Sequence, residues 1–123
     1  MTHRAARRVL IVEDEYLVAM ELEDLLAEMG YRVVGPAARI NEAIDLARDA
    51  EIDFAVLDIN LAGTRSFPVA DILRQRNIPF VFASGYGSDG LADGYRHETI
   101  LRKPYALQDL EQAIATVVLP ITR

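Results

Sequence analysis

Short apolar runs alternate along the chain with longer stretches in which apolar residues recur every three or four positions. The short runs are rich in β-branched residues and predict strands, because a strand that is buried on both faces needs no polar alternation. The longer stretches place their apolar residues on one face and predict amphipathic helices. The predicted strands are residues 8–13, 31–34, 53–58, 80–84 and 99–102, and the predicted helices are residues 15–29, 41–50, 68–76 and 107–118.

Residues typical of helix ends stand at three of these limits. Gly30 follows the first helix, Asn41 can cap the second, and Pro68 suits the first turn of the third. The side chains predicted to face the core are Val18, Leu22, Leu25, Leu26 and Met29 in the first helix, Ile40, Ala43, Ile44 and Ala47 in the second, and Leu110, Ala113, Ile114, Val117 and Val118 in the last.

Five strands that alternate with helices predict an α/β fold, with one parallel sheet covered by helices on both faces. The alternation fails at residues 85–94, which hold four of the seven glycines. Glycine lowers helix stability by up to about 1 kcal/mol per residue relative to alanine. We therefore expect a loop or a frayed turn there, in place of a firm helix between the last two strands.

The composition fits one globular domain spanning residues 1–123, with a basic N-terminal arm at residues 1–7. Hydrophobic residues make up 51% of the chain and charged residues 26%, a balance typical of folded proteins. The absence of cysteine excludes disulfides and thiol nucleophiles. No apolar run approaches the roughly 18 residues that cross a bilayer, so a cytoplasmic protein is expected. The net charge of −6 disfavours direct binding of nucleic acid.

Acidic residues, a serine and the chain's one lysine stand at the ends of four predicted strands. Because the carboxyl ends of parallel strands meet at one edge of a sheet, these side chains are expected to converge there. They are Glu13 and Asp14 after the first strand, Asp58 at the end of the third, Ser84 at the end of the fourth, and Lys103 after the fifth.

Three clustered carboxylates repel one another, so positive charge is expected among them. Lys103 supplies one charge, and Mg²⁺, which prefers hard oxygen ligands, can supply the rest. Asp14 and Asp58 are the predicted side-chain ligands. The backbone carbonyl of Asn60 is well placed for a third contact, and Glu13 can act through a metal-bound water.

A carboxylate beside Mg²⁺ and a lysine can act as a nucleophile and accept a phosphoryl group. Asp58 is the candidate, with Lys103 and the Ser84 hydroxyl each able to bind a phosphoryl oxygen. Each residue also has a simpler interpretation, since Asp14 could cap a helix and a Ser-Gly pair is a common turn. The coincidence at four strand ends favours a site.

This set of residues resembles the receiver domain of bacterial two-component response regulators. The similarity runs from Val9 to about Val118 and includes the run Val9-Leu-Ile-Val-Glu13-Asp14, then Leu57-Asp58, then Ser84, then Lys103-Pro104. It implies a flavodoxin-like (βα)5 three-layer sandwich. It also implies Asp58 as phosphoacceptor, Glu13 and Asp14 near Mg²⁺, Ser84 as switch hydroxyl and Lys103 as partner of the phosphoryl group. The Lys103–Pro104 bond is often cis in the family.

The chain departs from the usual receiver pattern at Ile100. Most members carry tyrosine or phenylalanine at this position, and that ring acts together with the switch hydroxyl. The segment from Pro79 to Gly87 resembles the signature of an atypical receiver group called FATGUY, which has a glycine-rich stretch in place of a firm fourth helix. The resemblance implies that Tyr86 flanks the path of attack on the phosphoryl group or contacts a partner. Tyr105, exposed in many such folds, has the same two interpretations.

The implied partner is a sensor histidine kinase or a phosphotransfer protein, and the implied output is contact with a further protein. The chain could instead serve as a phosphoryl sink or shuttle, as a pseudo-receiver that never takes phosphate, or as a module of a longer protein. The sequence is also compatible with a homodimer. A phosphohydrolase is disfavoured, because such enzymes usually carry an acid where this chain has Asn60.

Overall fold

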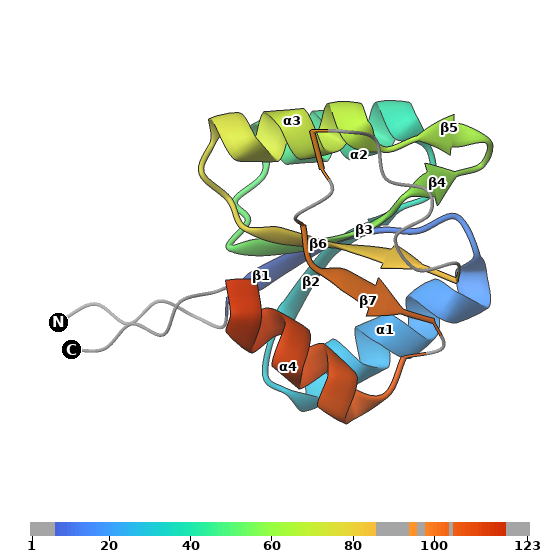
Figure 1. Cartoon of the computed structure of the whole chain (residues 1–123), viewed down its shortest axis with the longest axis vertical. Helices are drawn as coiled ribbons and strands as arrows, with labels where there is room; N and C mark the ends of the chain where they lie inside the picture. The colour runs from blue at the N-terminus through green and yellow to red at the C-terminus, as the bar shows by residue number, and fades with distance from the viewer. Residues whose placement is uncertain (1–6, 86–93, 96–97, 104, 118–123) are drawn as a thin grey trace, which may run out of the picture.

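A parallel sheet of five strands crosses the middle of the molecule, and helices cover both of its faces (Figure 1). The computed structural model describes residues 7–85, 94–95, 98–103 and 105–117. The strands of this sheet are β1 (Arg8–Val12), β2 (Arg32–Ala37), β3 (Phe54–Asp58), β6 (Phe80–Ser84) and β7 (Ile100–Arg102). Their order is β2-β1-β3-β6-β7, and every neighbouring pair is parallel. The predicted flavodoxin-like fold is confirmed, with β3 at the centre.

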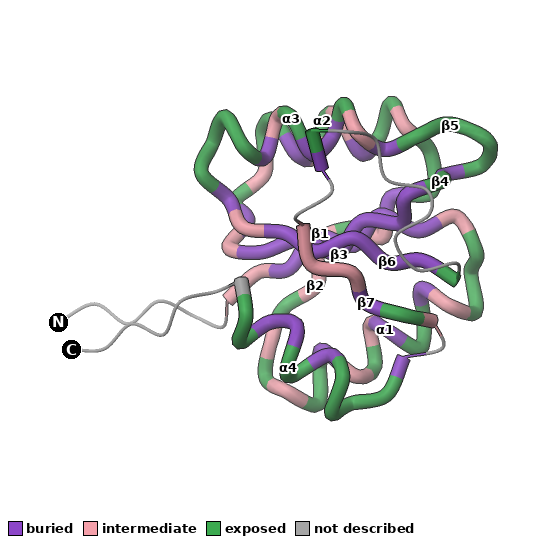
Figure 2. The backbone as a smooth tube through the Cα atoms, viewed as in Figure 1, coloured by how far each residue is buried: buried purple, intermediate pink, exposed green. Residues whose placement is uncertain are grey.

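Two described helices lie on each face of the sheet. The helices α2 (Ile40–Asp49) and α3 (Phe67–Gln75) pack side by side on one face. The helices α1 (Tyr16–Glu28) and α4 (Leu107–Val117) lie on the other (Figure 1). Figure 2 shows the central strands buried between these layers. Burial from both sides explains why β3 and β6 are apolar without alternation.

Most of the predicted core positions are confirmed. Buried are Leu22, Leu26, Ala43, Ala47, Leu110, Ala113 and Ile114, and partly buried against the same clusters are Val18, Leu25, Met29, Ile40 and Ile44. Ala19 is also buried in α1, although its small side chain contributed little to the helical pattern. Val118 and the side chain of Val117 lie outside the described residues.

Two predicted boundaries are wrong. Asn41 lies inside α2, which begins after the extended residue Arg39, so Asn41 does not cap the helix. The second strand continues to Ala37 through a cis Gly35–Pro36 bond. A proline fits there because β2 is an edge strand, where a missing N–H can face away from the sheet. Glycine and proline usually mark turns, so the sequence pattern predicted the end of the strand before Gly35.

A short hairpin that the sequence pattern did not reveal follows β3. In it, β4 (Asn60–Leu61) pairs antiparallel with β5 (Thr64–Arg65). The two residues between them, Ala62 and Gly63, have φ of 50° and 86°. A tight hairpin turn of this kind needs positive φ at both positions, which glycine adopts readily. The hairpin lies against the end of β1, because the N–H of Ala62 donates to the carboxylate of Asp14 at 3.2 Å.

Some predictions fall outside the described residues. They concern most of the glycine-rich stretch (residues 86–93, with Tyr86), the Lys103–Pro104 bond, and residues 1–6 of the basic arm. Within the part of the chain that the structure describes, no helix is long and apolar enough to cross a membrane.

Candidate functional site

Charged side chains gather at the carboxyl end of the sheet. Glu13 and Asp14 follow β1, Asp58 ends β3, and Lys103 follows β7. The three acids, called here the acidic group, each offer a carboxylate oxygen within 4.8 Å of the others. Parallel strands bring these residues together because their carboxyl ends reach the same edge, and β1 and β3 are direct neighbours.

The ammonium of Lys103 lies between two carboxylates of the acidic group. Its Nζ is 2.8 Å from Glu13 Oε1 and 3.2 Å from Asp58 Oδ2, and it is 3.9 Å from Glu15 Oε1. The main-chain N–H of Lys103 donates to the carbonyl of Ser84 at 3.2 Å, which ties the lysine to the end of β6. One ammonium thus offsets only part of the negative charge at this edge.

Two members of the acidic group are buried. Glu13 is 2% exposed and Asp58 is 8% exposed. Burial, followed by the charge of Glu13, raises the pKa of Asp58 to about 7, although Lys103 acts in the opposite direction. Burial opposes the charged form of Lys103 as well. Its hydrogen bond with Glu13 and the charge of Asp58 outweigh that effect, and the pKa of Lys103 is raised.

The acidic group fits a divalent cation. Carboxylate oxygens are the hard ligands that Mg²⁺ prefers, and a second positive charge would relieve the repulsion among three crowded acids. Among the described residues, Glu13, Asp14 and Asp58 form the cluster whose oxygens lie close enough to share one ion. The donor set therefore suits magnesium.

Comparison with known families agrees with this geometry. Residues 9–115 match the model of the response regulator receiver domain. The chain belongs to the response regulator receiver family. Receiver domains accept a phosphoryl group from histidine kinases and act as phosphoacceptors rather than as catalytic enzymes. The acidic group stands at the phosphorylation site of this fold.

Individual relatives share the fold over most of this chain. The solution structure of SdrG from Sphingomonas melonis Fr1 has a TM-score of 0.82 and 40% identity, covering 92% of this chain and 97% of that one. The BeF3-activated conformation of SdrG from Pseudomonas melonis Fr1 has a TM-score of 0.77, with the same identity and coverage. The transcriptional regulatory protein PdtaR of Mycobacterium tuberculosis is 34% identical over 91% of this chain. The receiver spans 57% of the length of PdtaR.

Two further predicted residues stand at the same edge of the receiver sheet. Ser84 is buried at the end of β6 and pairs in register with Arg102 of β7. Asn60 is exposed at the start of β4, just beyond the end of β3. The roles of Ser84 in binding a phosphoryl group and of the Asn60 carbonyl in binding metal stay predictions.

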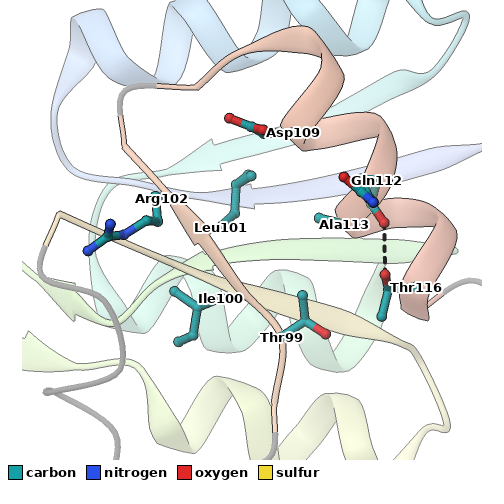
Figure 3. Close-up of a pocket in the computed structure, with 8 residues that line it drawn as sticks. All are labelled: Thr99, Ile100, Leu101, Arg102, Asp109, Gln112, Ala113 and Thr116. Atoms are coloured by element: carbon teal, nitrogen blue, oxygen red, sulfur yellow. Dashed lines mark hydrogen bonds between the residues drawn. The ribbon is translucent and has the colours of Figure 1, made fainter.

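Ile100, the predicted switch position, and Tyr105 both pack against apolar clusters of the sheet. Ile100 is partly buried and lines a hollow of about 290 Å³ between β7 and α4 (Figure 3). The expectation that Tyr105 is exposed is wrong. Its ring is buried in the apolar cluster that joins β1, β3 and β6 to α4, because it packs among the apolar side chains of these elements. The Tyr105 hydroxyl has no hydrogen-bond partner among the described residues.

Sequence reasoning missed two residues, Glu15 at the site and Tyr95 on the α3 face of the sheet. The N–H of Glu15 donates to Glu13 Oε2 at 3.1 Å, and its carboxylate faces Lys103. The run of three acids from Glu13 to Glu15 was a signal for this. Tyr95 is buried against β6 and α3. It stands outside every predicted element, so no spacing rule could have singled it out.

Proposed function

We propose that this receiver takes a phosphoryl group onto Asp58 from the phosphohistidine of a sensor histidine kinase or a phosphotransfer protein. The P–N bond to the imidazole breaks, a P–O bond to an Asp58 carboxylate oxygen forms, and the released imidazole nitrogen keeps the bonding electron pair. The observation that supports this is the place of Asp58 at the sheet edge, where its carboxylate contacts the ammonium of Lys103, which also contacts Glu13. A carboxylate held there can act as a nucleophile.

The acidic group would hold Mg²⁺ during this transfer. Asp14 and Asp58 are the proposed side-chain ligands, the carbonyl of Asn60 is a third, and Glu13 acts through a water. When bound, the metal neutralises charge on the transferring phosphoryl oxygens. The hydrogen bond from Ala62 to Asp14 supports this assignment, because it helps to fix that carboxylate beside Glu13 and Asp58.

Lys103 and Ser84 would respond to the new phosphoryl group. Lys103 already lies 3.2 Å from an Asp58 oxygen and would pair with the dianion. The Ser84 hydroxyl would bind another phosphoryl oxygen. Both residues belong to the ends of β6 and β7, so their movement would change the face formed by these strands. A downstream protein would read that change.

Apolar side chains beside the acidic group fit the approach of a protein partner. Tyr16 and Leu17, in the first turn of α1, are 74% and 77% exposed, and Met20 is also exposed. Tyr16 and Met20 line a hollow of about 380 Å³ whose rim includes Glu13 and Asp14. An apolar surface beside a charged pocket supports a protein as the phosphoryl donor.

The test is phosphotransfer from candidate kinases to the wild type and to Asp58→Asn, with Mg²⁺. Intact mass should rise by about 80 Da in the wild type, as expected for one phosphoryl group, and stay unchanged in Asp58→Asn. Asp49→Asn, an exposed acid on α2, is the matched control and should be labelled normally. Label on Asp58→Asn would refute Asp58 as the acceptor, and a wild type that takes no label from kinase or acetyl phosphate would favour a pseudo-receiver.

Leu17→Glu tests the proposed donor surface separately. It should slow transfer from the kinase at least about tenfold, because a charge replaces an apolar contact. Labelling by acetyl phosphate should be unaffected, since that small donor needs no α1 surface. Equal loss with both donors would contradict a docking role for Leu17.

The finer classification is part of the proposal. The segment from Pro79 to Gly87 and the 40% identity to SdrG support a FATGUY-like receiver forming a single domain over residues 1–123. In that case the output is a protein contact, or the domain acts as a phosphoryl sink or shuttle. Direct binding to nucleic acid is disfavoured by the net charge of −6.

A further inference from the structure

Tyr95 belongs to an aromatic cluster on the α3 face of the sheet. The residue is 9% exposed. Its ring stacks on Phe67 with centroids 4.7 Å apart and meets Phe82 edge-on at 5.8 Å. Phe67 and Phe82 also meet edge-on, at 5.7 Å. The three rings therefore join the start of α3 to the middle of β6 through Tyr95.

Polar contacts hold the Tyr95 segment onto α3 as well. The Tyr95 hydroxyl donates to the carboxylate of Asp71, and the guanidinium of Arg74 lies 4.2 Å from the ring centroid. Arg74 also donates to the carbonyl of Gly94 at 2.9 Å and to the carboxylate of Glu98 at 2.5 Å. Tyr95 with Asp71 and Arg74 is called here the Tyr95 clamp.

Two short paths connect this clamp to the phosphoacceptor. Along β6, Phe82 and Ser84 are two positions apart, so their side chains lie on the same side of the strand. Ser84 ends that strand at the acidic edge. Along the chain after β3, the N–H of Ser66 donates to the carbonyl of Ile59 at 2.9 Å. Phe67 follows directly. A shift at the strand ends therefore reaches both rings that Tyr95 contacts.

The clamp also compensates for the departure at position 100. Ile100 pairs in register with Phe82 and packs against the same apolar cluster as Tyr95. Tyr95, in the segment that leads into β7, thus adds an aromatic ring to this cluster, whereas β7 itself contributes the aliphatic Ile100.

We propose that Tyr95 is the aromatic switch of this receiver, docked on α3 when Asp58 is unmodified and released when Asp58 carries a phosphoryl group. In the docked state the hydroxyl, the ring face and the ring edge all have partners. A shift of the β6 and β7 ends therefore removes contacts and has few to add. The released ring, with the surface of Phe67 and Asp71 that it uncovers, is the face that a downstream protein reads. This inference rests on the proposed function, because it requires phosphorylation of Asp58.

Thermodynamic linkage gives a quantitative test. If docking of Tyr95 favours the unmodified state, a weaker clamp must favour the modified state by the same factor. Tyr95→Phe keeps the ring and loses the bond to Asp71, so it should bind beryllofluoride with Mg²⁺ about threefold to tenfold more tightly. Tyr31→Phe, at a partly buried tyrosine of the opposite cluster, is the matched control and should leave the affinity unchanged.

Fluorine NMR of 3-fluorotyrosine-labelled protein gives the direct readout, with the Tyr95 signal assigned by its loss in Tyr95→Phe. Beryllofluoride should move that signal towards the position of free fluorotyrosine. If the Tyr95 signal and the affinity of Tyr95→Phe both stay unchanged while the backbone amide of Lys103 shifts, the clamp is only structural and the switch is refuted. If neither residue responds, Asp58 does not take the phosphoryl mimic, and the proposed function fails with it.

Discussion

At the acidic edge three carboxylates crowd around one ammonium, whereas on the α3 face each polar group of the Tyr95 clamp has a partner of its own. Glu13 and Asp58 compete for Lys103. By contrast, the Tyr95 hydroxyl has Asp71 and the guanidinium of Arg74 has Glu98. Incomplete compensation leaves the first region able to gain from a cation or from covalent change. Complete pairing holds the second region in one arrangement until its supports move.

The two regions share β6, so the strand connects reaction and response. Ser84 stands at one end of this connection and Phe82 at the other, with Phe82 contacting the rings of Phe67, Phe80 and Tyr95. Substitutions in either region test this comparison.

Removing Phe82 should produce the largest effect, because this buried ring supports the whole aromatic cluster. Phe82→Ala should lower the free energy of unfolding by about 3–5 kcal/mol, from lost burial and the cavity left behind. Urea denaturation measures it. Phe82→Leu is the control and should lose about 1 kcal/mol. A loss below about 1 kcal/mol for the alanine variant would mean that the cluster does not hold β6 in place.

Removing Lys103 should have the next largest effect. Lys103→Met leaves Glu13 and Asp58 without their cation, and in metal-free protein at pH 7.5 it should lower the free energy of unfolding by about 2–4 kcal/mol. Mg²⁺ should restore part of the loss. The control is Arg48→Met, which removes an exposed cation of α2 and should leave the melting temperature unchanged. Equal stability of Lys103→Met and wild type would show that the acidic edge is not short of positive charge.

Stability of the metal-free protein should depend on pH through Asp58. Its pKa is about 7 in the folded protein and about 3.9 in an unfolded chain. The folded state therefore gains from protonation at low pH and loses that gain as pH rises through 7. The melting temperature should fall between pH 5.5 and pH 8 by at least about 4 °C, which corresponds to roughly 1 kcal/mol in a domain of this size.

Mg²⁺ and Asp58→Asn isolate that contribution. Mg²⁺ should raise the melting temperature more at pH 8 than at pH 5.5, and Asp58→Asn should remove the decline attributed to this carboxyl. A decline of the same size in Asp58→Asn would assign the pH dependence to another group.

The smallest effect separates two buried tyrosines. Tyr105→Phe removes a hydroxyl without a partner among the described residues and should raise the free energy of unfolding by up to about 1 kcal/mol. Tyr95→Phe removes a hydroxyl bonded to Asp71 and should lower it by about 1 kcal/mol. Shifts of the same sign in both variants would remove the distinction between an unpartnered and a clamped hydroxyl.

The order of elements along the chain was enough to predict both the fold and the convergence at the acidic edge. Alternating strands and helices imply a parallel sheet, and in such a sheet residues that end strands share one edge. That rule placed Glu13, Asp58 and Lys103 together although they lie far apart in sequence. It could not reveal the hairpin after β3, because the two-residue strands are shorter than any periodic pattern.

The sequence by itself determined the architecture and the acidic edge, since both follow from periodicity and from which residues end the strands. Only the tertiary structure decided the surroundings of Tyr95 and Tyr105. Each is a tyrosine outside a strand or helix, yet one hydroxyl meets Asp71, 24 residues away, and the other is buried without a partner among the described residues. Such contacts depend on how layers of side chains pack, which no local pattern encodes.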